Sequence, residues 1–191
     1  ELRGHGQSWP PPVNGTMELL TADILRALDA LEIERFVIGG HSIGGMIAID
    51  MLRACPERLL GVVSIEGWTN HRVAAEAFGG SISTTLTDEQ EARRLRERAR
   101  VLARWTEEQQ RDFASIWRRW DGYDLLARTD APVLELWGDR RRERPSQALM
   151  RIPDRPNITL HWVANASHSL LIERPREVAE AINGFVAGLR T

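Results

Sequence analysis

The sequence contains no lysine, a single cysteine and no long hydrophobic run. All 25 basic residues are arginine, which we attribute to the base composition of the source genome rather than to a function. The single cysteine, Cys55, excludes an internal disulfide and a metal site built from cysteine ligands. The most apolar stretch, residues 36–52, contains His41 and Asp50 and is shorter than the roughly 20 residues that a membrane-spanning helix needs. With no signal peptide visible either, we expect a cytoplasmic protein that does not enter a membrane.

The charges nearly balance, with 25 basic and 27 acidic side chains and a formal net charge of −2. This balance gives no overall attraction to nucleic acid or to an anionic membrane. The arginine-rich segment 93–104 is interleaved with Glu89, Glu91 and Glu97, a pattern typical of a solvated, salt-bridged helix face. We therefore expect a small-molecule substrate as the partner, and neither nucleic acid nor membrane. Whether the chain forms a homo-oligomer stays open.

Strand and helix patterns alternate along most of the chain. Continuous apolar runs bounded by turn residues predict four strands buried on both faces, at residues 35–39, 60–65, 132–137 and 158–163. Helical spacing predicts helices at residues 17–31, 43–54 and 174–189, the first capped by Thr16. This alternation predicts an α/β fold with a mostly parallel sheet flanked by helices.

The long segment between the second and third predicted strands interrupts the alternation and holds two further helical patterns. We predict a core formed by residues 1–67 and 129–191 and a helical cap inserted at residues 68–128. The insert is rich in tryptophan, which usually packs in a core but can also line an apolar pocket. His41, Trp68 and Trp117 are the candidate substrate-binding residues.

Residues 40–44 form the most informative motif, G-H-S-I-G, which follows a predicted buried strand and opens a helix. This strand–turn–helix context is typical of a nucleophile elbow, in which a serine is exposed on a strained turn. We expect the flanking residues Gly40 and Gly44 to be glycine because a side chain at either would collide with neighbouring backbone. Ser42 is the candidate nucleophile, and the backbone N–H of Ile43, in the first helical turn, is the candidate oxyanion donor.

Together with this motif, three further segments resemble the α/β-hydrolase family with a helical cap. They are LRGHGQS at residues 2–8, PVLELWGD at 132–139 and ANASHSLLIERP at 164–175. The resemblance implies hydrolysis of a small ester or related carbonyl compound, with no cofactor and no metal. It also implies that strands precede Glu1, about 60–90 residues of the same domain, among them the loop with the second oxyanion donor. A serine nucleophile excludes the family's haloalkane dehalogenase and epoxide hydrolase chemistries, which need aspartate.

A serine hydroxyl needs a base within hydrogen-bond reach. His168 follows the end of a predicted strand on a short polar loop, where open α/β sheets build their sites, and it matches the family's histidine position. We therefore expect His168 to be the general base. His161 lies inside a predicted strand, and we expect it to be a packing residue.

The acid that would orient His168 is less clear, because the position that usually carries it in the family, three residues after Gly138, holds Arg141. Two carboxylates could replace it. Asp139 lies on the same loop but is flanked by arginines that would compete for it. Glu66 follows an apolar strand, beside Trp68, as in certain haloalkane dehalogenases, and we favour it for its dry surroundings.

These residues together predict a serine hydrolase that cleaves a small, mostly hydrophobic carboxylic ester or lactone through an acyl-enzyme on Ser42. Within the family, carbon–carbon bond hydrolysis and perhydrolysis stay open. Because Arg141 departs from the family pattern, the alternative is a non-catalytic ligand-binding protein, a receptor or pseudoenzyme, on the same fold.

Overall fold

The computed structural model describes residues 1–80 and 85–189, and within them four parallel strands form one sheet in the order β1-β2-β3-β4. Their bounds are β1 Phe36–His41, β2 Leu59–Ile65, β3 Val133–Gly138 and β4 Ile158–Val163. The predicted strands are confirmed to within one or two residues. The part of the expected cap at residues 81–84 lies outside the described residues.

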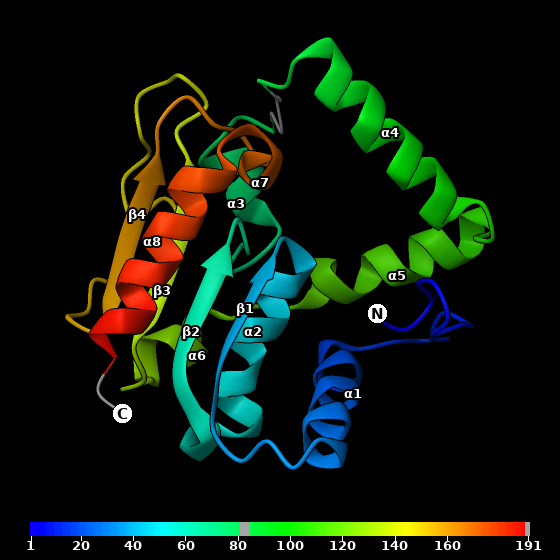
Figure 1. Ribbon diagram of the computed structural model, residues 1–191, viewed down its shortest axis with the longest axis horizontal. Coiled ribbons are helices and arrows are strands. Elements are labelled where there is room, and N and C mark those ends of the chain that lie inside the picture. The colour runs from blue at the N-terminus through cyan, green and yellow to red at the C-terminus, as the bar shows by residue number, and fades with distance from the viewer. Residues whose placement is uncertain (81–84, 190–191) are drawn as a thin grey trace.

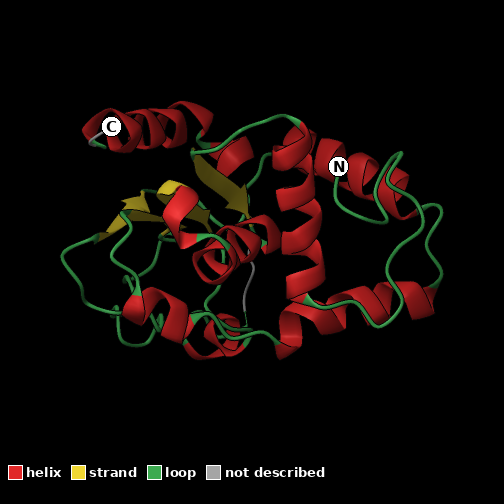
Figure 2. Ribbon diagram, turned by 90° about the horizontal axis from the view of Figure 1, so that it is seen from below, coloured by secondary structure: helices red, strands yellow, loops and turns green. Residues whose placement is uncertain are grey.

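Helices cover both faces of the sheet (Figure 1, Figure 2). The described helices are α1 Met17–Ala30, α2 Ile43–Ala54, α3 Arg72–Glu76, α4 Asp88–Leu102, α5 Glu107–Arg119, α6 Tyr123–Arg128, α7 Leu170–Glu173 and α8 Pro175–Gly188, with a short 3-10 turn at Pro56–Arg58. One core joins α1, α2 and the insert to one face, and a smaller core lies beneath α8 on the other. Thr16 caps α1 as expected, its side chain accepting from the Leu19 N–H at 3.2 Å.

The prediction that all four strands are buried on both faces is wrong for two of them. Strands β2 and β3 are almost entirely buried, whereas β1 and β4 form the edges of the sheet and are partly exposed. His161 lies on edge strand β4 and is exposed, so the expectation that it packs in the core is also wrong. An apolar run indicates a strand, but its burial depends on which strands lie beside it.

The region 68–128 contains α3 to α6. Figure 1 shows α4 and α5 diverging from a common corner, with α5 running back toward α2 while α4 stands apart from the sheet. Both helices begin with a capping box, formed by Thr87 with Gln90 and by Thr106 with Gln109. Helix α4 has no buried residue, and two of its arginines, Arg93 and Arg94, pair with Glu97 and Glu91 of the same helix, in line with its charge pattern. Among the described residues, no helix combines the length and apolarity that crossing a membrane requires.

Candidate active site

The turn between β1 and α2 holds Ser42 in a backbone conformation that is rare for any residue other than glycine, with φ 56° and ψ −120°. Its N–H donates to the carbonyl oxygen of Ile65 at 2.8 Å, which ties the turn to the end of β2. The Ile43 N–H lies in the first turn of α2, where backbone N–H groups have no acceptor within the helix. The turn thus presents a hydroxyl and an N–H donor at the same edge of the sheet.

The glycines of this turn differ in the space that a side chain would find. A Cβ on Gly40 would lie 2.3 Å from the backbone of Gly44, so no larger residue fits there. Gly45 and Gly67 face each other in the same way, with a Cβ on Gly45 only 2.8 Å from the Cα of Gly67. At Gly44 itself a Cβ would meet nothing within 4 Å. The expectation that Gly44 must be glycine is therefore wrong on steric grounds, because its own Cβ direction is open.

Three predicted site residues come together at the carboxyl ends of β1, β2 and β4. The Oγ of Ser42 lies 3.2 Å from Nε2 of His168. On the other side of the ring, Nδ1 of His168 lies 3.2 Å from Oε2 of Glu66. This is the order of contacts that a hydroxyl nucleophile, a base and an orienting carboxylate require.

Glu66 is fully buried and is held by several donors. Its Oε1 accepts from the Gly138 N–H at 2.8 Å, and Arg140 binds both carboxylate oxygens, at 3.1 and 2.5 Å. Burial by itself raises the pKa of Glu66, but the hydrogen bond to His168 and the charge of Arg140 outweigh that effect, so the pKa lies below its usual value. Glu66 is therefore a carboxylate at neutral pH.

Asp139, the other candidate acid, has different partners. Its Oδ1 accepts from the backbone N–H groups of Arg141, at 3.0 Å, and Asn165, at 2.8 Å. The bond from Asn165 joins the loop after β3 to the loop after β4. Asp139 thus supports the loop that carries His168, and its hydrogen bonds run to backbone rather than to the imidazole.

Two of the three candidate substrate-binding residues, His41 and Trp68, contact His168, and the third, Trp117, packs against Trp68. The Nε2 of His41 lies 2.6 Å from the His168 carbonyl oxygen, and burial together with the nearby His168 lowers the pKa of His41. The Trp68 ring lies 5.6 Å from the His168 ring, and the Trp117 ring packs edge-on against Trp68 at 6.3 Å. Trp68 and Trp117 thus extend from the imidazole toward α5.

An open groove of about 780 Å³ lies between α4, α5 and the N-terminal loop. Its aromatic wall is formed by Trp105, Phe113 and Trp117, and His5 packs edge-on against the first two. Its lining is more apolar than polar, although Arg98 and other arginines also take part. Trp117 belongs both to this groove and, through Trp68, to the series of rings from His168, so it is the residue that links the groove to the candidate active site.

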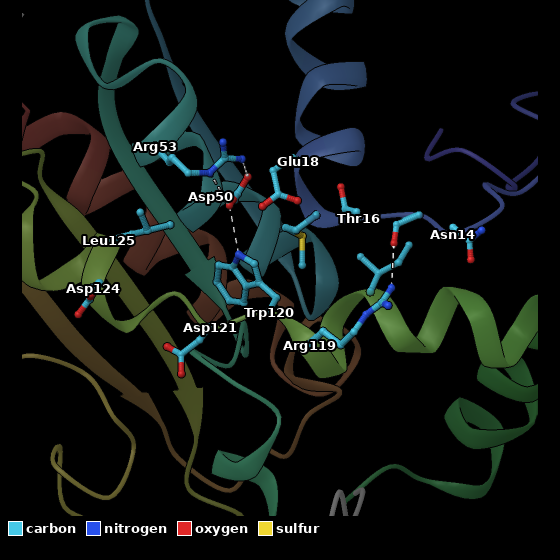
Figure 3. A pocket seen from close by; sticks show the side chains of 13 residues that line it. Asn14, Thr16, Glu18, Asp50, Arg53, Arg119, Trp120, Asp121, Asp124 and Leu125 are labelled. Carbon is cyan, nitrogen blue, oxygen red and sulfur yellow. Dashed lines mark hydrogen bonds and ion pairs between the residues drawn. The ribbon is translucent and has the colours of Figure 1, made fainter.

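A smaller cavity, of about 420 Å³, lies where α1, α2 and the end of α5 meet (Figure 3). The buried Asp50 accepts hydrogen bonds there from Thr21, Arg53 and Trp120, at 2.8, 2.7 and 3.1 Å. With donors on both oxygens, this carboxylate anchors the end of α5 to α2. The contacts indicate a structural role.

Two buried charged residues near Glu66 were not identified from the sequence. Arg140 was expected only to compete for Asp139, whereas it pairs with Glu66; the sole signal was its place just after Gly138, at the end of the strand beside β2. Glu135 lies within β3 and is fully buried, its Oε2 accepting from the Trp137 indole at 3.0 Å. Burial raises the pKa of Glu135 to about 8.

Among the described residues, no group of three histidine, cysteine or acidic side chains is arranged to hold a metal ion.

Comparisons with known proteins show the family of the chain and the similarity of its fold. A family model described as "Alpha/beta hydrolase family" matches residues 1–181. The fold is similar to that of an enol-lactonase from Burkholderia xenovorans LB400, at 21% identity, a TM-score of 0.75, and coverage of 98% of this chain and 79% of that one. It is also similar to a thermophilic esterase from Thermogutta terrifontis, at 23% identity, a TM-score of 0.71, and coverage of 100% and 79%.

A curated relative also matches along most of the chain. The dihydrolipoyllysine-residue acetyltransferase component of the acetoin cleaving system of Cupriavidus necator is 24% identical over 98% of this chain and 55% of its own length. The chain thus spans only about half of the length of two curated relatives, 55% of this one and 42% of another. These similarities concern the fold.

Proposed function

Because the chain belongs to the alpha/beta hydrolase family, we propose that it is a serine hydrolase that cleaves a small, mostly hydrophobic carboxylic ester or lactone. The observation that carries the proposal is the contact of His168 with Ser42 Oγ on one side and with Glu66 on the other, each at 3.2 Å. A serine hydroxyl becomes nucleophilic when such a base accepts its proton.

In the proposed first step, Ser42 Oγ attacks the substrate carbonyl carbon while its proton moves to Nε2 of His168. The negative charge that develops on the carbonyl oxygen is stabilised by the N–H of Ile43, aided by the positive end of α2. His168 then gives the proton to the leaving alkoxide, which departs as an alcohol and leaves an acyl ester on Ser42.

In the second step, His168 takes a proton from water, and the resulting hydroxide attacks the acyl ester. Collapse of this second tetrahedral intermediate releases the carboxylic acid and returns the proton to Ser42 Oγ. Glu66 accepts the hydrogen bond from Nδ1–H throughout, which holds the tautomer with Nε2 free and stabilises the imidazolium as it forms.

The groove beside Trp117 supports an apolar acyl or alcohol group as the bulk of the substrate, because its wall is aromatic and its lining mostly apolar. The series from His168 through Trp68 to Trp117 would lead such a group away from the reacting carbonyl. Two proteins of similar fold, an enol-lactonase and an enzyme that degrades N-acyl homoserine lactones, support including lactones among the substrates to be tested.

The test is hydrolysis of p-nitrophenyl esters and aliphatic lactones, together with labelling by a fluorophosphonate probe. We expect stoichiometric labelling and turnover in the unmodified protein, and loss of both in Ser42→Ala. The exposed serine Ser8, changed to alanine, is the matched control and should leave both intact. A folded protein that shows neither labelling nor turnover would instead favour the non-catalytic ligand-binding alternative.

A further inference from the structure

The Glu66 carboxylate has all of its acceptor positions in use. A carboxylate offers about four lone-pair sites, two on each oxygen. At Oε1 they receive the Gly138 N–H and Nη1 of Arg140, and at Oε2 they receive Nη2 of Arg140 and the His168 ring. Arg140 therefore contributes two of the four contacts that determine how Glu66 faces His168.

Arg140 is held in this position at an energetic cost. Its side chain is 2% exposed, and its Nε has no hydrogen-bond partner among the described residues. Its backbone has φ 53°, and that of Glu66 has φ 51°, both in the left-handed region. Nη1 donates to the Gly138 carbonyl oxygen at 2.6 Å, and the ring of Phe78, from the insert, covers the guanidinium at 3.7 Å. Burying an arginine on a strained backbone is unfavourable, so its contacts must contribute more than those of an ordinary exposed ion pair.

We propose that Arg140 is a positioning residue of this hydrolase: it fixes the orientation of the Glu66 carboxylate toward His168 and neutralises its charge. The inference rests on the proposed function, because it concerns the same site. It predicts that Arg140 affects the catalytic step and its pH dependence, without contacting the substrate.

The charges around the site determine the direction of the pH effect. The titratable or charged groups facing Glu66 and His168 are Arg140, His41 and Glu135. With Arg140 present, a neutral His168 leaves a balanced Arg–Glu pair. When the Arg140 charge is removed and His168 is neutral, the buried Glu66 carboxylate has no cation beside it. The site therefore retains its proton to higher pH. The acidic limb of kcat/KM should then move up by about one to two pH units, while His41 and Glu135 are the same in both proteins.

The experiment compares Arg140→Met with Arg141→Met. Arg141 is the matched control because it is exposed, lies on the same loop and has a similar left-handed backbone, with φ 56°. For ester hydrolysis we expect Arg140→Met to lower kcat at least about 10-fold, leave KM within about twofold and raise the pH of the acidic limb. Arg141→Met should match the unmodified protein. An Arg140→Met profile equal to that of the control would overturn the inference.

Two further variants separate positioning from simple support of the fold. Arg140→Lys retains the charge but not the two-pronged contact, so kcat should fall while the acidic limb stays in place. In a Glu66→Gln background, Arg140→Met should cause no further loss of kcat; an additional loss would contradict action through Glu66. If Arg140→Met does not fold, Arg140→Lys decides, because an unchanged kcat there rejects the inference. An inactive unmodified protein would reject the proposed function itself.

Discussion

The Glu66 carboxylate, at the end of β2, reaches His168 in the loop after β4 across the intervening strand β3. Gly138, at the end of β3, makes this contact sterically feasible. A Cβ at Gly138 would lie 2.4 Å from the carbonyl oxygen of Ala166, so glycine lets the histidine loop lie close to the sheet. The Gly138 N–H also donates to Glu66. An acid at the end of β2 can therefore replace the one that Arg141 excludes from the usual position.

Changing the acid is the first prediction. Glu66→Gln should lower kcat by about 10⁴-fold, because the amide no longer holds the productive tautomer of His168. Asp139→Asn retains one oxygen for the two backbone N–H groups that Asp139 binds, so it should lower kcat less than about 10-fold. Steady-state kinetics on a p-nitrophenyl ester measure both variants, with circular dichroism to establish that each is folded. The reverse order of losses would assign the acid to Asp139.

The second prediction concerns the glycines of the serine turn. Gly40→Ala should destabilise the fold by about 3 kcal/mol or more, because its Cβ collides with backbone that cannot move independently. Gly44→Ala should be neutral or stabilise by up to about 1 kcal/mol, because its Cβ meets open space within α2 and alanine favours a helix. Urea unfolding gives both free energies. Equal destabilisation at the two positions would contradict the described turn.

The third prediction uses the buried Glu135, whose pKa is raised by burial to about 8. Between its ordinary value and about 8, the folded state holds a proton that the unfolded state has released. The free energy of unfolding should therefore fall as pH rises through this window, by about 1.4 kcal/mol per unit from this group. Glu135→Gln, which stays neutral, should lack this slope.

Urea unfolding at several pH values tests this directly. Relative to the unmodified protein, Glu135→Gln should become progressively more stable from about pH 5 to about pH 8. The matched control is Glu143→Gln on the exposed loop after β3, which should run parallel to the unmodified protein. Parallel curves for Glu135→Gln as well would show that Glu135 is ionised in the fold.

Local sequence patterns were sufficient for the elements that build the sheet. Apolar runs and helical spacing depend on neighbouring residues, so the four strands and helices α1, α2 and α8 were predicted nearly to their ends. The apolar runs alone did not show that β1 and β4 are partly exposed, because that depends on strand order, although a sheet of four strands already implied an uncovered edge beside the strand that leads to Ser42. The open Cβ direction at Gly44 depends on the three-dimensional path of the turn.

The candidate site was predictable where a motif marks it and unpredictable where partners come from distant loops. The spacing around Ser42 and the loop around His168 indicate their places directly. Arg140, Arg141 and Arg142 are chemically alike in the sequence, and only the fold shows that Arg140 turns inward to Glu66 while its neighbours are exposed. Which of the three would be buried depends on backbone conformation within a single loop.

The fourth prediction tests the groove as the binding place of an apolar acyl chain. Trp117→Ala removes part of the aromatic wall, so kcat/KM for a p-nitrophenyl ester of a medium-length chain should fall about 10-fold, and that for the acetate ester less than about twofold. Trp162→Ala, on edge strand β4, is the control tryptophan and should leave the ratio of the two substrates unchanged. An equal loss for both esters would place the acyl chain elsewhere.

The acyl-enzyme on Ser42 can be detected by mass spectrometry of the protein quenched during turnover of a slowly deacylated ester. We expect a covalent adduct with the mass of the acyl group, confined to the peptide that contains Ser42 and absent in Ser42→Ala. Ester turnover that persists in Ser42→Ala, or an adduct on another residue, would contradict the proposed mechanism.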